Sequence, residues 1–345
     1  MPSALAAATD RSARVSTGAA PLIELWRGHM LESAHAGHAV ICDADGAIVE
    51  AWGNPDARIY PRSSCKMVQA LPLLESGAGD GLSDARLALA CASHEGAAIH
   101  TGAVARWLAD LDLTEADLRC GTHVPKDATA QAELIRSGRT ACQLHNNCSG
   151  KHAGFLMLSR HLRAGSEYVE HDHPVQQAVR TAFEEVTGMT SPGYGIDGCS
   201  APNYATTVHG LARAMAFFAA AETRPGARAQ AAARLRRAMA RHPEMVAGEG
   251  RACTELMRAM GAGVAIKTGA EAVFVAILPA QRIGIALKIV DGSTRAAEAA
   301  ITALLIRCGV LDPAHPAAQA RLGGSLRNWR GLEVGQLRTA PGFLR

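Results

Sequence analysis

Ser63 and Lys66 lie three residues apart in the run Arg-Ser-Ser-Cys-Lys at positions 62–66. Residues three apart share one face of a helix, so the lysine amine can reach the serine hydroxyl. A lysine that is buried or close to a second cation loses basicity, and its neutral amine can then activate a serine nucleophile. Much later in the chain, Lys267-Thr268-Gly269 supplies such a cation just before an apolar, strand-like run. These residue types and spacings predict acyl transfer by a lysine-activated serine.

The Lys267-Thr268-Gly269 motif has further chemical uses in this interpretation. Lys267 could orient a hydroxyl or bind a substrate carboxylate. Gly269 would let a substrate approach the strand backbone closely, because glycine has no side chain. The simpler interpretation of the motif is a strand-end lysine whose amine reaches solvent.

Two other serines could take part in this chemistry. Ser64 lies two residues from Lys66 and would face elsewhere on a helix, which makes it the weaker nucleophile. Ser93 begins the segment Ser93-His94-Glu95-Gly96, directly after an apolar run. The simpler interpretation of that segment is a polar loop at the end of a helix. The functional interpretation is a second serine that faces the nucleophile.

A third set of residues has the chemistry of metal ligands. Cys148 and Lys151 are three residues apart at an expected helix start, where the helix N-terminus would lower the pKa of the thiol. Cys199 follows in a glycine-rich loop, and two thiolates with nitrogen or carboxylate donors can hold zinc. The candidate further donors are His145, His152 and Asp197. The spacing is not that of a standard zinc motif, so two loop cysteines at a polar pocket are the simpler interpretation. For His171-Asp172-His173 a solvated helix start is the better interpretation.

Strand-like patterns at both ends of the chain surround a helical middle. Strands are expected over 21–26, 38–43, 48–52, 263–268, 272–279 and 282–290. Helices are expected over 63–74, from 83, and over 100–111, 151–164, 174–187, 203–221, 227–242 and 293–308. The simplest assembly is an α/β (α+β) fold, in which helices flank one antiparallel sheet built from both termini. The expected divisions are a tail over 1–20, a sheet domain over 21–80 plus 261–345, and an inserted helical domain over 81–260, forming one catalytic unit.

Composition narrows the functional classes. The 345 residues are 48% hydrophobic and 19% charged, and the net charge of +3 comes without a dense basic stripe, so nucleic-acid binding is not expected. No apolar stretch is long enough to cross a bilayer, and residues 1–20 lack the pattern of a secretory signal, which predicts a mobile tail and no membrane association. Nine cysteines, an odd number, favour free thiols and a cytoplasmic location.

The Ser-x-x-Lys and Lys-Thr-Gly motifs also occur together in serine β-lactamases and penicillin-binding proteins. Those proteins carry a Ser-Asp-Asn motif as well, which this chain lacks. Ser93 is the nearest counterpart, and it comes without the asparagine. This departure argues against a β-lactam substrate.

From about residue 21 to its C-terminus, the chain resembles the Rhizobium etli-type L-asparaginases. The resemblance is carried by the segments at 62–66, 93–96, 147–154, 194–199 and 267–269. Cys-Ser-Gly-Lys-His at 148–152 and Asp-Gly-Cys at 197–199 are specific to that family, whereas Ser-x-x-Lys and Lys-Thr-Gly are shared more widely.

The resemblance implies a fold similar to that of serine β-lactamases, a homodimer, and hydrolysis of L-asparagine to L-aspartate and ammonia. It implies two serine–lysine pairs, Ser63 with Lys66 and Ser93 with Lys267. In the resulting hypothesis Lys66 takes the Ser63 proton, Ser63 attacks the side-chain amide, and Ser93 and Lys267 relay protons during hydrolysis of the acyl-enzyme.

The resemblance also implies a zinc ion bound by Cys148, Lys151 and Cys199, with water completing the coordination. A coordinating lysine must be neutral, which zinc itself can enforce. The zinc could serve the chemistry or only substrate affinity. The residues expected to contact the substrate are Arg62, His94, Glu95, Asn147, Asp197, Thr268 and Gly269.

Three alternative functions stay open at this point. A serine glutaminase is one, because the single methylene that separates glutamine from asparagine is worth only about 1–3 kcal/mol in a pocket. A β-lactam or D-amino-peptide hydrolase is the second. The third is an amino-acid-binding protein without catalysis, although such a protein would not need to keep both serine–lysine pairs.

Overall fold

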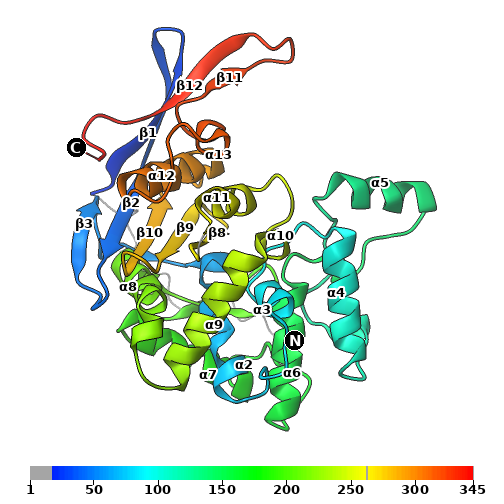
Figure 1. The fold of residues 1–345 in the computed structure, drawn as a ribbon. Coiled ribbons are helices and arrows are strands. Elements are labelled where there is room, and N and C mark those ends of the chain that lie inside the picture. Colours follow the sequence, from blue (N-terminus) through cyan, green and yellow to red (C-terminus); the bar gives the residue numbers. More distant parts are fainter. Residues whose placement is uncertain (1–17, 262, 345) are drawn as a thin grey trace, which may run out of the picture.

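One antiparallel sheet of eight strands organises the computed structural model, which describes residues 18–261 and 263–344 (Figure 1). The strand order is β11-β12-β1-β2-β10-β9-β8, and β3 pairs with β2. The strands are β1 (Ala20–Arg27), β2 (Met30–Cys42), β3 (Ile48–Trp52), β8 (Ala265–Gly269), β9 (Val273–Leu278), β10 (Ile283–Ile289), β11 (Ser325–Arg327) and β12 (Glu333–Thr339). The prediction of a single antiparallel sheet built from both ends of the chain is therefore confirmed. Most of the tail predicted over 1–20 lies outside the described residues.

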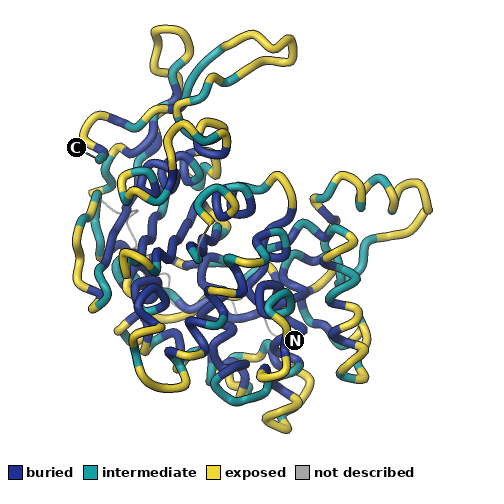
Figure 2. The backbone as a smooth tube through the Cα atoms, viewed as in Figure 1, coloured by how far each residue is buried: buried dark blue, intermediate teal, exposed yellow. Residues whose placement is uncertain are grey.

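The sheet extends further than the sequence pattern predicted. β2 starts at Met30 rather than near residue 38, and β11 and β12 were not predicted. The added portions are largely exposed, so they lack the buried, apolar alternation by which strands are recognised. The hairpin of β1 and β2 and the loop between β11 and β12 project together from the body, and their tips are exposed in Figure 2.

Helices cover the centre of the sheet. Every residue of β9 is buried, which requires cover on both of its faces. Two helices, α8 (Val208–Ala219) and α12 (Thr294–Arg307), both pack on β9 and β10. The buried centre and the exposed rim are visible in Figure 2.

The middle of the chain is mainly helical, as predicted. Its helices are α3 (Asp84–Ala90), α4 (Ala98–Ala109), α5 (Ala128–Ser137), α6 (Ser149–His161), α7 (Pro174–Thr187), α9 (Ala227–Arg241), α10 (Pro243–Val246) and α11 (Ala252–Met260), and α13 (Pro316–Gln319) follows later. α5 projects from the body (Figure 1). Single 3-10 turns are η2 (Glu115–Asp117), η3 (Gln143–His145) and η4 (Ala221–Thr223). Among the described residues, no helix is both long and apolar enough to span a membrane.

Local signals account for the helix ends. Ser83 caps α3 by accepting a hydrogen bond from the Arg86 N–H, and His173 caps α7 in the same way from the Val175 N–H. The His171-Asp172-His173 segment is thus a helix start, as interpreted. The helix predicted over 203–221 is shorter, because two short strands, β6 (Pro202–Tyr204) and β7 (Thr206–Thr207), occupy its first turns. β6 pairs with β5 (Tyr194–Ile196), and β7 pairs with β4 (Arg58–Ile59).

Gly284 tests the packing of α8 on the sheet. A Cβ atom at this position of β10 would overlap backbone atoms of Ala212 and Ala216 in α8. We expect Gly284→Ala to lower the free energy of unfolding by about 1–3 kcal/mol or more, because overpacking displaces backbone. Gly81→Ala is the matched control, since nothing lies within 4 Å of its added Cβ. Denaturant unfolding measures both variants, and equal stabilities would contradict the described packing.

Candidate active site

Ser63 lies in a tight 3-10 turn, η1 (Arg62–Cys65), and not at the start of one long helix. The helix predicted over 63–74 is instead divided into η1, α1 (Lys66–Gln69) and α2 (Leu71–Glu75). Arg62 has a φ of 51°, a left-handed conformation that is costly for a residue with a side chain. Such conformations cluster at functional sites, where the surrounding structure maintains them. The turn leaves Ser63 half-buried.

Gly269 allows η1 to pack directly on β8. A Cβ atom at Gly269 would lie 2.7 Å from the Pro61 carbonyl oxygen and 3.0 Å from the Ser64 nitrogen. In this structure, therefore, the backbone that approaches Gly269 is that of η1, whereas the sequence suggested a substrate. The Ser64 hydroxyl donates to the Pro61 carbonyl at 2.6 Å and is fully buried, so it faces away, as predicted.

Ser93 lies between two lysine amines. Its Oγ is 2.7 Å from Lys267 Nζ and 3.1 Å from Lys66 Nζ. Lys66 is fully buried and Lys267 is 1% exposed, so both amines are removed from water. The Ser63 hydroxyl makes no hydrogen bond to any residue that the structure describes, and the predicted contact between Ser63 and Lys66 is not formed. The structure thus joins both lysines to Ser93.

The two amines differ in how they are held. Lys66 Nζ also donates to the Ala92 carbonyl and lies 3.1 Å from Cys148 Sγ. Lys267 Nζ donates to the Thr268 carbonyl at 2.8 Å. Burial, and after it the charge of Lys66, lowers the pKa of Lys267 to about 7. Near neutral pH the Lys267 amine is therefore available to accept the Ser93 proton.

Cys148, Lys151 and Cys199 are brought together, as the metal hypothesis requires. Cys148 directly precedes α6, Lys151 lies in the first turn of that helix, and Cys199 lies in the loop between β5 and β6. Lys151 Nζ is 3.2 Å from Cys199 Sγ, and all three side chains are buried. A Cβ atom at Gly150 would overlap the Leu89 carbonyl, so α6 packs backbone to backbone on α3. That close approach fixes the two α6 donors relative to the segment that carries Ser93.

The chemistry of these donors fits a zinc ion. A hydrogen bond from Cys148, and after it the charge of Lys151, lowers the pKa of Cys199 well below its usual range. His152 Nε2 is buried without a hydrogen-bond partner, while its Nδ1 meets the Tyr168 hydroxyl at 3.0 Å. Within the described residues, no group of three or more His, Cys, Asp or Glu side chains is arranged to hold a metal. The donor set is therefore complete only if the lysine is itself a ligand.

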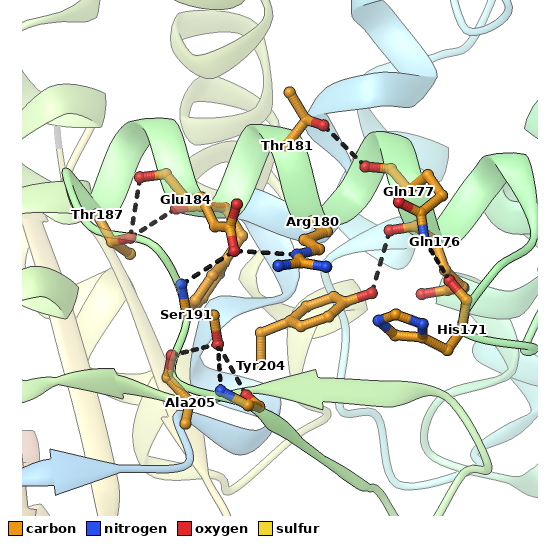
Figure 3. A network of polar contacts seen from close by, with 12 residues as sticks. His171, Gln176, Gln177, Arg180, Thr181, Glu184, Thr187, Ser191, Tyr204 and Ala205 are labelled. Atoms are coloured by element: carbon orange, nitrogen blue, oxygen red, sulfur yellow. Dashed lines mark hydrogen bonds and ion pairs between the residues drawn. The ribbon is translucent and has the colours of Figure 1, made fainter.

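Helix α7 anchors the hairpin that carries Cys199. Figure 3 shows the network: the Tyr204 hydroxyl donates to the Gln176 carbonyl at 3.2 Å, and Glu184 accepts from the Ser191 N–H at 3.0 Å. Tyr204 lies in the second strand of the hairpin, and Ser191 lies just before the first. Both ends of the hairpin are thus bonded to one rigid helix.

An ion pair joins this hairpin to η1. Arg62 Nε and one of its terminal nitrogens both donate to Asp197 Oδ1, at 3.0 and 2.9 Å. The same oxygen accepts from the Gly198 N–H at 2.8 Å. Arg62 and Asp197 were both predicted to contact the substrate, and in this structure they bind each other.

His94 is part of the support beneath Ser93. Its side chain is buried, its Nε2 meets the Ser149 hydroxyl at 3.0 Å, and its Nδ1 accepts from the Gly96 N–H at 3.1 Å. The ring also stacks on His100 with centroids 4.7 Å apart. Burial lowers the pKa of His94 well below its usual range. Both ring nitrogens of His94 are thus engaged within the protein, and its contact with a substrate stays a prediction.

Asn147 borders Lys66, and Glu95 pairs with Arg251. The Asn147 carbonyl is 3.4 Å from Lys66 Nζ, and its side-chain oxygen accepts from Cys148 Sγ at 3.1 Å. Glu95 Oε1 lies 3.4 Å from a terminal nitrogen of Arg251.

The sequence interpretation missed the contribution of residues 246–253. The Val246 carbonyl accepts from the Ser93 N–H at 2.8 Å, and Cys253 Sγ accepts from the Thr268 N–H at 3.3 Å. The run Gly-Glu-Gly-Arg at 248–251, between two helical patterns, is the signal that could have identified it.

Comparison with known proteins gives one family. Residues 23–339 match the family model described as L-asparaginase II. Comparison with curated proteins finds no match. Among solved structures, the chain is similar to a protein called Mglu in its tris and glutamate form, at 13% identity and a TM-score of 0.47, over 80% of this chain and 59% of that chain.

Two other solved structures are similar at the same low identity. One is a beta-lactamase from Mycobacterium bovis, at 13% identity and a TM-score of 0.42, over 79% of this chain and 94% of that chain. The other is an octameric penicillin-binding protein homologue from Pyrococcus abyssi, at 13% identity and a TM-score of 0.39, over 86% and 80%. The chain spans less than two thirds of the length of the Mglu chain.

The pKa of Lys267 can be measured directly. The sequence holds only five lysines, so NMR of protein labelled with ¹³C-lysine resolves each one. We expect one lysine signal to titrate near pH 7 and to vanish in Lys267→Met. Burial, and after it the charge of Lys66, opposes the charged form of Lys267 and so lowers its pKa. Lys126→Met, at an exposed position, is the control. If every lysine titrated above pH 9, the described environment of Lys267 would be wrong.

Proposed function

Because the chain belongs to the L-asparaginase II family, we propose that it hydrolyses the side-chain amide of L-asparagine to L-aspartate and ammonia. One observation carries the catalytic part of the proposal: the Ser93 hydroxyl lies within hydrogen-bond distance of two buried lysine amines. Burying two amines together is costly, and a protein that only binds an amino acid does not need to do so. A serine between the two amines has one neighbour that can accept its proton and a second that can supply a positive charge.

In the proposed first step, Lys267 takes the Ser93 proton as Oγ bonds to the amide carbonyl carbon. The charge of Lys66 stabilises the negative oxygen that develops beside it. The carbon–nitrogen bond then breaks, and the nitrogen leaves as ammonia after it takes the proton from Lys267. An aspartyl ester on Ser93 results. Water, deprotonated by the same amine, cleaves that ester and releases L-aspartate.

This assignment exchanges the roles of the two serines relative to the sequence-based hypothesis, in which Ser63 attacks. The contacts of both lysines support the exchange. Ser63 stays near the site in the proposal, since η1 packs on the strand that carries Lys267. The Arg62–Asp197 ion pair holds η1 against the β5–β6 hairpin. In the proposal, η1 orients the substrate from this fixed position.

Ammonia release from L-asparagine tests the proposal. We expect Ser93→Ala to reduce kcat by about 10³-fold or more, as loss of a nucleophile does. Ser166→Ala, at an exposed serine, is the matched control and should keep full activity. Circular dichroism of each variant establishes that the fold is intact.

Each alternative has its own outcome in the same assay. Near-full activity of Ser93→Ala with loss in Ser63→Ala would return the nucleophile to Ser63. Faster release from L-glutamine than from L-asparagine would make the protein a glutaminase. Covalent trapping by penicillin would favour a β-lactam hydrolase, and asparagine binding without ammonia would favour a binding protein.

We further propose that the chain is of the Rhizobium etli type and that Cys148, Lys151 and Cys199 hold a zinc ion. Support comes from the three buried donors and from the unpaired His152 Nε2 beside them. Bound zinc would supply a Lewis acid that polarises an oxygen of water or substrate. Loading requires Lys151 and the Cys148 thiol to lose their protons, so it releases protons to solution. We also propose that the protein forms a homodimer and that it resides in a reducing cytoplasm. The homodimer rests on the resemblance, and the location rests on the free thiols.

Metal analysis tests the zinc site without reference to activity. After incubation with zinc and desalting, we expect about one ion per chain in the parent protein and little in Cys199→Ser. Cys308→Ser removes a half-buried thiol on α12's C-terminal side and is the control. A chelator should lower the Tm of the loaded parent protein only, because a ligand of the folded state stabilises it. Equal zinc in parent and Cys199→Ser would refute the assignment.

A further inference from the structure

A cavity of about 240 Å³ opens where the turn between β2 and β3 meets α7, α8 and the start of α9. Three arginines line it, Arg213 from α8, Arg224 from the segment after η4, and Arg228 from α9. None of its lining residues belongs to the candidate active site. The convergence of three guanidinium groups from three elements makes the cavity electrostatically unusual.

Two of these arginines are largely compensated. Arg228 is held by Glu75 through two contacts of 2.7 and 3.0 Å and by Glu185. Arg224 donates to the Ala44 carbonyl and lies over the Phe217 ring, 5.5 Å from its centroid. The Nε of Arg224 is nevertheless buried without a hydrogen-bond partner, which leaves part of its positive charge unsatisfied.

Arg213 has no such compensation. Its guanidinium makes no hydrogen bond and no ion pair with any residue in 18–261 or 263–344. The side chain passes between two glycines: a Cβ at Gly46 would lie 2.6 Å from Arg213 Cγ, and a Cβ at Gly188 would lie 2.6 Å from Arg213 Cζ. His209 Nε2 meets the Gly46 carbonyl at 2.9 Å and holds that turn in place. Arg213 is an exposed residue, but these close contacts confine its side chain before any ligand arrives, which lowers the entropy cost of binding one.

We propose that this cavity binds a small oxyanion, a phosphate or a carboxylate, through Arg213 with Arg224 behind it. The planar guanidinium fork matches two oxygens of such an anion. At about 30 Å³ per water molecule, the volume equals that of about eight waters, which admits a small anion and lies below the usual size of sites for drug-sized ligands.

The acidic side chains at the rim do not oppose this assignment. Glu185 is already paired with Arg228. Asp45 pairs with Arg224 at 3.8 Å and is 93% exposed, so solvent and salt screen its charge. The unpaired charge that faces the cavity is that of Arg213.

Binding of inorganic phosphate tests the proposal on the full chain. Calorimetric titration of phosphate, with ionic strength held constant by sodium chloride, should give saturable binding to the parent protein. Arg213→Ala should raise the Kd by about tenfold or more, as loss of a charged hydrogen bond does. Arg213→Lys keeps the positive charge but loses the planar guanidinium group, so its Kd should lie between that of the parent protein and that of Arg213→Ala. Arg136→Ala, on the exposed helix α5, is the matched control and should bind as the parent does.

The same titration with acetate in place of phosphate distinguishes a carboxylate ligand from a phosphate ligand. Binding of both anions indicates recognition of a pair of oxygens, and binding of phosphate alone indicates an inorganic oxyanion site. No saturable binding of either anion to the parent protein would overturn the proposal. So would phosphate binding that Arg213→Ala leaves unchanged while its circular dichroism matches that of the parent.

Discussion

Two buried lysine amines share one half-buried hydroxyl, and the rest of the site depends on that arrangement. A buried ammonium loses its hydration, and a second one nearby raises the cost again, so one amine gives up its proton. The carbonyls of Ala92 and Thr268 accept hydrogen bonds from the amines and offset part of this cost. Whatever excludes water from Lys66 and Lys267, or holds them at Ser93, therefore sets the basicity on which the chemistry relies.

Hydrophobic patterning predicted the sheet and the long helices, because these elements bury a regular face. α7 begins and ends at the predicted residues. His173 caps its start, Pro174 occupies its first position and Gly188 ends it, and all three are signals that can be recognised in a sequence. The first half of β2, together with β11 and β12, was missed. The first half of β2 pairs with β1 in an exposed hairpin, β12 pairs with β1 across most of the chain's length, and β11 pairs with β12, so these strands carry little local signal.

Motif chemistry identified Ser93, both lysines and the cysteine pair as members of one site. The Ser93–Lys267 contact that the resemblance implied is present, whereas Lys66 contacts Ser93 and not Ser63. The predicted Ser63–Lys66 contact assumed an α-helix, whereas a 3-10 turn ends at Cys65 and directs Lys66 elsewhere. The amine of Lys66 contacts groups far along the chain, from Ala92 to Cys148. Residue spacing within one helix cannot predict contacts between such distant parts of the sequence.

The sheet order also sets when, during synthesis, this protein can become functional. β2 needs β10 on one side, and β1 needs β12, so the first strands made wait for the last. Pairing over such separations is slow and leaves strand edges exposed in the interval. Lys267 enters the chain late and is buried only when β8 joins β9. The depressed basicity of that amine is therefore acquired at the end of folding, and a nascent chain that stalls earlier carries an ordinary charged lysine in its place.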